Sequence, residues 1–129
     1  MKVFSPMIPA FLAAGWLVVS CASGPVDIPE DMPPNKIIQR AQEASDNNKY
    51  KIAIQYYEAL LERYGAAPEY LITAEYEIAF IHYKDKKYAL AREEFELILG
   101  RYKEDAKSYP PKFSILATKV LERIGSLGY

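Results

Sequence analysis

The stretch that decides the fold is Tyr88–Tyr102, YALAREEFELILGRY, because its pattern already occurs 38 residues upstream as Tyr50–Tyr64, YKIAIQYYEALLERY. The offset pairs Tyr50 with Tyr88, Ala53 with Ala91, Tyr57 with Phe95, Leu60 with Ile98, Leu61 with Leu99, Arg63 with Arg101 and Tyr64 with Tyr102. The shared apolar positions form one stripe of a helix with 3.6 residues per turn, and not the alternation of a strand. The sequence therefore predicts two copies of an amphipathic helix.

The same offset connects a second kind of helix. Ala41, Ala79 and Ala117 follow one another at steps of 38 residues, each inside an amphipathic pattern. A small residue on a buried stripe lets a neighbouring helix come close, and a large residue one turn away fills the groove beside it. The repeating unit is thus a pair of helices, present about two and a half times.

This pattern of a Tyr, an Ala, an aromatic residue and an aliphatic pair resembles the tetratricopeptide repeat (TPR) family. The resemblance covers about residues 35–124, and the period is longer than the 34 residues or so typical of the family. Arg40 and Ala44 depart from it, since they stand where a large apolar and an aromatic residue are usual. The resemblance implies an all-α fold, a short right-handed α-solenoid of about two and a half TPR-like helix pairs with five helices in all. Long repeats of this kind are similar to those of bacterial envelope lipoproteins, including the TPR lipoprotein of outer-membrane β-barrel assembly.

Residues 1–20 have the composition of a signal peptide. An apolar run from Met7 to Val19 follows the single charge at Lys2, and it is too short to span a bilayer comfortably. The sequence around Cys21, LVVSCA, resembles the lipobox of bacterial lipoproteins, which implies cleavage before this cysteine and its acylation. Two alternatives stay open: ordinary cleavage after Ser23, or retention of the segment as a weak anchor. Cys21 is the one cysteine of the chain and so has no partner for an internal disulfide, which favours lipidation.

Residues 22–34 contain four prolines and almost no periodicity, and we interpret them as a spacer. Extended polyproline geometry would let them hold the folded part about 40 Å from the lipid. The alternative is that the segment packs back along the first helix through Val26, Ile28 and Met32. The expected organisation is a lipoprotein signal peptide at 1–20, the lipidated cysteine and Pro-rich tether at 21–34, the TPR-like domain with a C-terminal capping helix at 35–125, and a tail at 126–129.

We expect helices at about 36–46, 50–64, 69–84, 88–102 and 111–124. Asn35 is a plausible N-cap of the first helix, and Gly65 and Gly125 are expected to end the second and fifth. The predicted buried residues of the first, third and fifth helices are Ile37, Ile38, Ala41 and Ala44; Leu71, Ala74, Ile78, Ala79, Ile81 and His82; and Phe113, Leu116, Ala117, Val120, Leu121 and Ile124. The fifth helix is expected to cover the end of the stack, as the terminal element of a solenoid must.

Composition and motifs argue against several classes of function. The net charge is −1, and lysines and arginines alternate with acidic residues, so nothing indicates nucleic-acid binding. His82, the single histidine, is expected to be a hydrogen-bonded core residue, with a metal ligand or a base as the alternative. The Glu93, Glu94 and Glu96 run is expected to be a solvated face. Lys84–Lys87 is expected to be a solvated turn, with contact to lipid head groups as the alternative. No phosphate loop or nucleophile motif occurs, so we expect neither an enzyme nor a bound metal or other cofactor.

In the TPR family the first helix of each pair lines an inner, concave face on which peptides or partner helices lie. Carried onto this chain, the resemblance implies a partner-binding face of Ile38, Gln42, Tyr76, Phe80, Tyr83, Lys84, Thr118 and Leu121. Tyr76, Phe80 and Tyr83 also follow an i, i+4, i+7 spacing out of phase with Ile78 and His82, so the third helix is apolar on more than one side. The alternative is that the cap or the tether covers these aromatic rings.

The sequence hence predicts a lipid-anchored adaptor that binds an envelope protein or peptide, in the bacterial cell envelope and on the outer membrane rather than the inner one, with a role in outer-membrane protein assembly as one option. Homo-oligomerisation stays open. One alternative is a ligand-handling TPR lipoprotein associated with a solute transporter, which an enclosed cavity would favour. The other is a surface-exposed adhesin.

Overall fold

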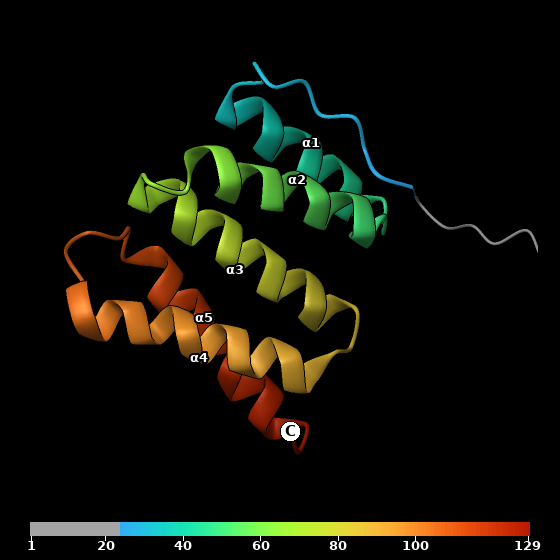
Figure 1. The fold of residues 1–129 in the computed structure, drawn as a ribbon. Helices are drawn as coiled ribbons and strands as arrows, with labels where there is room; N and C mark the ends of the chain where they lie inside the picture. Colours follow the sequence, from blue (N-terminus) through green and yellow to red (C-terminus); the bar gives the residue numbers. More distant parts are fainter. Residues whose placement is uncertain (1–23) are drawn as a thin grey trace, which may run out of the picture.

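The computed structural model describes residues 24–129, so the expected signal peptide and Cys21 lie outside the described residues. The described part holds five α-helices and no strand: α1 Pro34–Asp46, α2 Tyr50–Tyr64, α3 Pro68–Lys84, α4 Tyr88–Asp105 and α5 Lys112–Ser126. Each helix packs on the next, and α5 also contacts α3. The helices therefore stack in chain order as a short α-solenoid, with the C-terminus at one end (Figure 1).

The 38-residue period is confirmed in the structure. Ala41, Ala79 and Ala117 are all fully buried, and so are Tyr57 and its counterpart Phe95. The turns repeat as well: Asn48 and Lys86, one period apart, both have positive φ, at 57° and 61°. In each turn the following lysine N–H donates to the carbonyl five residues back, which closes the helix end.

The core divides into two clusters that meet on α3. One cluster joins α1 and α2 to Ala74 and Ile81 of α3, and the other joins Ile72, Tyr76 and Ala79 of α3 to α4 and α5. Because α3 lies between two neighbours, it needs two apolar faces, which explains its excess of apolar residues. Leu71, Ile78 and His82, expected to be buried, are only half-buried, and Ile72 and Tyr76 take the buried places. On α5, Leu116 is exposed and Leu121 half-buried, contrary to expectation.

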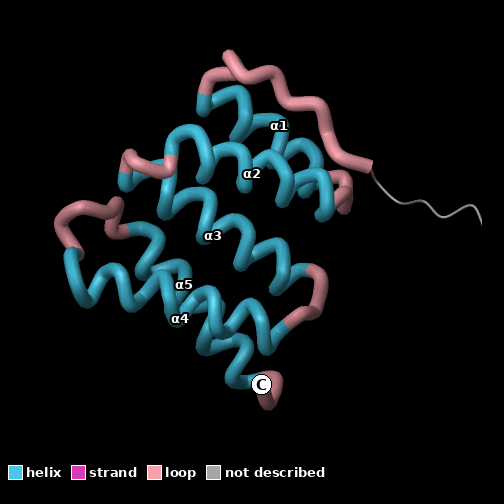
Figure 2. The backbone as a smooth tube through the Cα atoms, viewed as in Figure 1, coloured by secondary structure: helices cyan, strands magenta, loops and turns pink. Residues whose placement is uncertain are grey.

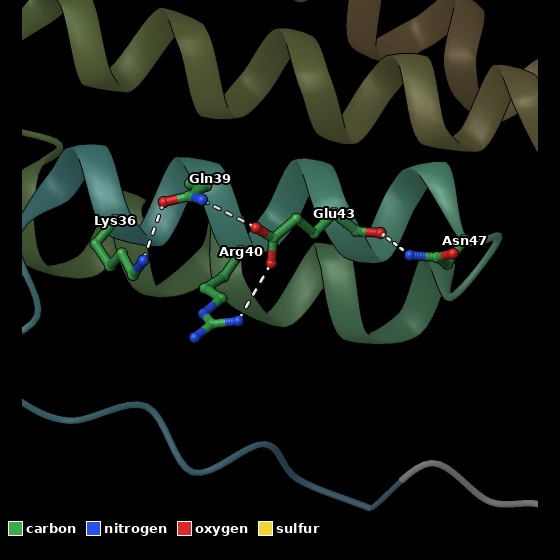
Figure 3. Close-up of polar contacts among 5 residues, drawn as sticks. All are labelled: Lys36, Gln39, Arg40, Glu43 and Asn47. Carbon is green, nitrogen blue, oxygen red and sulfur yellow. Dashed lines mark hydrogen bonds and ion pairs between the residues drawn. The ribbon is translucent and has the colours of Figure 1, made fainter.

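The exposed side of α1 explains one of the two departures from the TPR pattern, Arg40; the other, Ala44, is buried in the first core cluster. No helix precedes α1 in the described chain, so Arg40 is free to point to solvent, where it pairs with Glu43 at 3.2 Å. A chain of polar contacts runs along this side from Lys36 through Gln39 and Glu43 to Asn47, whose amide donates to the Glu43 carbonyl at 2.7 Å (Figure 3). A polar outer side is what a terminal repeat requires.

The helix ends differ from expectation in a few places. Asn35 does not cap α1; Pro33 is the N-cap and Pro34 the first helical residue. Proline suits this position because its φ is already helical and its missing N–H would have no partner there. Gly65 does end α2, whereas α5 continues past Gly125 to Ser126 and turns at Gly128, whose φ is 88°.

Residues 24–33 are not a free spacer, which corrects our interpretation of this part of the tether. The Val26 N–H donates to Oε1 of Gln55 at 2.7 Å, and Arg63 donates to the carbonyls of Ile28 and Pro29 at 2.9 and 2.6 Å. Tyr64 Oη donates to the Met32 carbonyl at 3.0 Å, and the Met32 side chain packs on the first core cluster. The segment therefore lies fixed against α2, beside the α1–α2 pair (Figure 2).

Candidate functional site

The face predicted to bind a partner is formed by α1, α3 and α5, and we call the surface shared by these three helices the inner face. A hollow of about 280 Å³ bridges them at one end, lined by Ile38, Glu69, Tyr70, Thr73, Pro110, Lys112 and Phe113. The predicted residues on these helices differ in accessibility. Gln42 and Thr118 are exposed, Ile38 and Leu121 half-buried, and Leu121 packs against the second core cluster.

Tyr76 belongs to the core and not to the inner face. Its side chain is 7% exposed, and its ring lies 5.5 Å from that of Phe95 and 5.2 Å from that of Phe113. Burial, with a smaller effect of the Glu77 charge, raises the pKa of Tyr76 to about 12. The capping helix α5 thus covers this residue, which corrects the expectation that it contacts a partner.

Phe80 and Tyr83 remain half-buried and form a row of rings with their neighbours. Phe80 stacks on Tyr76 at 6.0 Å and on Tyr83 at 5.8 Å between ring centroids. The row continues from Tyr83 to Tyr88 at 5.7 Å, and from Tyr88 to the C-terminal Tyr129 at 5.0 Å. The predicted tail is therefore in contact with the α4 end of this row, and Phe80 and Tyr83 keep part of their rings available.

Lys84 links α3 to the first repeat. Its ammonium group donates to the Ser45 hydroxyl and lies 5.3 Å above the ring of Tyr50 and 5.7 Å above that of Phe80. Such cation–π contacts hold a charged group over an apolar surface. Lys84 is consequently a half-buried cation on the inner face, and the expectation that it sits in a solvated turn is wrong for this residue.

Glu77 supplies the opposite charge on α3. Burial raises the pKa of this carboxyl above its ordinary value, and the charges of Lys84 and Lys112 oppose that rise without cancelling it. The inner face thus combines half-buried rings with a carboxylate and two lysines. This chemistry suits contact with a protein or peptide that offers both apolar and polar groups.

A second hollow lies on the other side of α3, and the sequence did not lead us to it. It is an open groove of about 860 Å³ between α2, α3 and α4, lined by Leu61, Glu75, Ile78, Glu93, Glu94, Glu96, Leu97, Ile98, Gly100, Arg101 and Glu104. We call it the outer groove. The glutamates were expected to be solvated, but Glu94 is half-buried, with Oε2 2.7 Å from Nδ1 of His82. The signal that could have found the groove is Leu97, an apolar residue among glutamates on the polar side of α4.

Two classes of feature are absent from the part of the chain that the structure describes. Between residues 24 and 129, no group of three or more His, Cys, Asp or Glu side chains is placed to hold a metal ion. Among the five helices, none has both the length and the apolar character needed to cross a bilayer.

Comparisons with known proteins add one relative. An uncharacterized protein of Treponema pallidum (strain Nichols) is 31% identical over 112 residues, which cover 84% of this chain and 45% of that protein. The chain thus spans less than half of the length of this relative. No protein-family model matches the chain, and no solved structure matches it significantly.

Proposed function

We propose that this chain is a lipid-anchored adaptor of the bacterial cell envelope that binds a protein or peptide partner on its inner face. The observation that carries the proposal is the row formed by Phe80 and Tyr83, whose half-buried rings lie beside the half-buried ammonium group of Lys84. Rigid aromatic side chains bury a large area at a low cost in conformational entropy, which is why they are enriched in binding hot spots. A helical-repeat fold suits this role because it presents side chains along an extended surface.

The anchor in this proposal is Cys21, which is separated from the apolar run of residues 7–19 by Ser20 alone and precedes the fixed segment. Acyl chains on this residue would attach the protein stably to a membrane, since two chains already suffice for lasting attachment. We propose the outer membrane as its location, and partners in outer-membrane protein assembly as the first to examine.

Lipidation is tested by expressing the full chain and its Cys21→Ser variant in bacteria supplied with an alkyne-labelled fatty acid. The wild type should carry the label and sediment with membranes, and the variant should lose both properties. Ser23→Ala, which keeps the cysteine, is the matched control. Labelling of Cys21→Ser at the wild-type level would exclude Cys21 as the acylated residue.

The adaptor role is tested with photo-cross-linking amino acids placed in the full chain in living cells. Gln42 and Thr118 are suitable positions because both are exposed on the inner face, and Lys51, exposed on α2, is the control. We expect the same partner adduct from both inner positions and none from Lys51. Phe80→Leu, which removes the ring but keeps an apolar contact with the core, should weaken the adduct.

The remaining outcomes are informative as well. Adducts between copies of the chain alone would make the inner face an interface of a homo-oligomer. An adduct that is equally strong from Lys51, or that is unchanged by Phe80→Leu in a protein with wild-type helicity, would show that the inner face is not the docking site.

A further inference from the structure

The fixed N-terminal segment provides an internal template for binding on the other side of the molecule. It crosses one stripe of α2: Val26 bonds to Gln55, and Ile28 and Pro29 bond to Arg63. Residues 55, 59 and 63 follow one another at i+4 spacing, so Ala59 lies between the two attachment points on the same side of the helix. Ala59 is 8% exposed. An extended chain is therefore held at Gln55 and Arg63, the two ends of a stripe that has the buried Ala59 at its centre.

The 38-residue repeat carries this stripe onto α4 as Glu93, Leu97 and Arg101. All three residues line the outer groove, and Leu97 is 71% exposed where its counterpart Ala59 is covered. The other walls of the groove are contributed by Leu61 of α2 and Ile78 of α3. The stripe on α4 thus corresponds to the stripe on α2 that holds the N-terminal segment. It differs by a larger apolar side chain at its centre.

The charges of the outer groove define its occupant. Five glutamates line it, at positions 75, 93, 94, 96 and 104, against the single cation Arg101. Arg101 is already engaged by Glu75, to which it donates two hydrogen bonds of 2.7 and 2.6 Å. Glu94 lies 2.7 Å from His82 and Glu96 lies 3.9 Å from Arg92, so among the described residues Glu93 and Glu104 are the groove glutamates outside any such pair. The groove is therefore net acidic around an apolar centre. It should attract lysines and arginines, and it should repel another copy of residues 24–33, which carry Asp27, Glu30 and Asp31 and no basic residue.

We propose that the outer groove binds an extended, basic segment of a partner protein, with an apolar side chain of that segment seated on Leu97 and its cations beside Glu93 and the neighbouring glutamates. The segment would cross α4 as residues 26–29 cross α2. Because the groove lies on the far side of α3 from the inner face, this interaction is additional to the proposed adaptor contact, and its failure would leave that contact untouched.

The test uses the full chain in neutral detergent and a fluorescent synthetic peptide. The peptide has the sequence of residues 24–32 with the changes Asp27→Lys, Glu30→Lys and Asp31→Lys, so that it keeps the template backbone and its apolar residues but carries the opposite charge. The unchanged, acidic peptide is the control. We expect saturable binding of the basic peptide alone, and weaker binding as the salt rises from about 0.05 to about 0.5 M, because the Debye length falls over that range.

Two groove variants and two matched controls locate the binding site. Glu93→Lys should lower the affinity about tenfold or more, since it reverses a charge that faces the peptide, and Leu97→Ser about fivefold through lost apolar contact. Glu122→Lys and Ile115→Ser change exposed residues of α5, where Ile115 is 57% exposed, and should leave the affinity unchanged. All four side chains are exposed, so the fold should persist, and circular dichroism checks this.

Nuclear magnetic resonance locates the bound peptide directly. Addition of the basic peptide should change the chemical shifts of the backbone amides of residues 93, 97 and 101. The proposal would be overturned if the basic peptide did not bind or if the acidic peptide bound equally well. It would also be overturned if Glu93→Lys and Leu97→Ser both bound the basic peptide with the affinity of the wild type. Shifts confined to Val26 and Gln55 would overturn it too, because the peptide would then be displacing the N-terminal segment and not filling the outer groove.

Discussion

Arg63 and Arg101 occupy the same position in successive repeats but bind different partners. Arg63 donates to the backbone carbonyls of Ile28 and Pro29, whereas Arg101 donates to both carboxylate oxygens of Glu75. The first arginine holds the N-terminal segment on the stack, and the second joins α3 to α4. The same repeat position therefore attaches the N-terminal segment in one copy and joins two neighbouring helices in the other.

Arg63→Ala should release residues 24–33 without unfolding the helices, because it removes both hydrogen bonds that fix the middle of the segment. Hydrogen bonds from a charged group are each worth about 1.5–3 kcal/mol at most, and exposure reduces this value here. Hydrogen exchange at the Val26 amide should accelerate about tenfold or more. Arg40→Ala, which breaks only an exposed pair with Glu43, is the control. Unchanged exchange at Val26 would mean that other contacts hold the segment.

The Arg101–Glu75 pair should contribute measurably to the free energy of unfolding because it is bidentate and half-buried. A double-mutant cycle with Arg101→Ala and Glu75→Gln should give a coupling of about 1 kcal/mol. Arg101→Lys should not restore it, because an ammonium group cannot reproduce the forked geometry. The Arg92–Glu96 pair, with 3.9 Å between the charged atoms and an exposed Glu96, is the comparison and should couple by about 0.3 kcal/mol. Equal coupling energies in the two cycles would refute this difference.

Glu77 should make the protein less stable as the pH rises. Its carboxyl has a raised pKa in the folded state, chiefly through burial, so the folded state binds the proton more tightly than the unfolded one. The stabilising effect is complete below the ordinary pKa of 4.5 and is lost as the pH rises through the higher, folded value. The free energy of unfolding of Glu77→Gln relative to that of the wild type should therefore increase from pH 4 to pH 7, measured by urea unfolding. This carboxyl should lose its proton between about those two pH values.

The exposed Glu122→Gln provides the control for that series, with a difference from the wild type that stays constant over the same range. A constant difference for Glu77→Gln as well would show that the lysines compensate fully for the burial of this carboxyl.

Lys86→Gly should stabilise the protein slightly. Lys86 adopts a φ of 61°, a region that costs residues with a side chain about 1–2 kcal/mol, while glycine loses about 0.5–1 kcal/mol more backbone entropy on folding. We expect a net gain of about 0.5 kcal/mol in thermal or urea unfolding. Lys87→Gly is the matched control: φ is −84° there, so glycine has no strain to relieve and should destabilise. A loss of stability in both variants would contradict the assignment of strain to Lys86.

The sequence predicted the helices and the repeat well because both depend on local patterns. The pairs Tyr57 and Phe95, and Leu60 and Ile98, follow from periodicity alone, and the structure buries all four. The position of Tyr76 did not follow, since its burial depends on Phe113, a residue of another helix. The attachment of residues 24–33 was equally hard to predict, because Arg63 binds backbone carbonyls there, and these carry no side-chain signature. Lipidation of Cys21 and binding on the inner face stay predictions.

The fixed N-terminal segment also limits how far the helical domain could stand from a membrane. Four residues separate Cys21 from Val26, the first residue bonded to α2. Fully extended, this connection spans no more than about 18 Å. A lipidated Cys21 would accordingly hold the part of α2 around Gln55 close to the lipid headgroups of the bilayer. Partners would then meet the stack close to the membrane plane and in a restricted set of orientations.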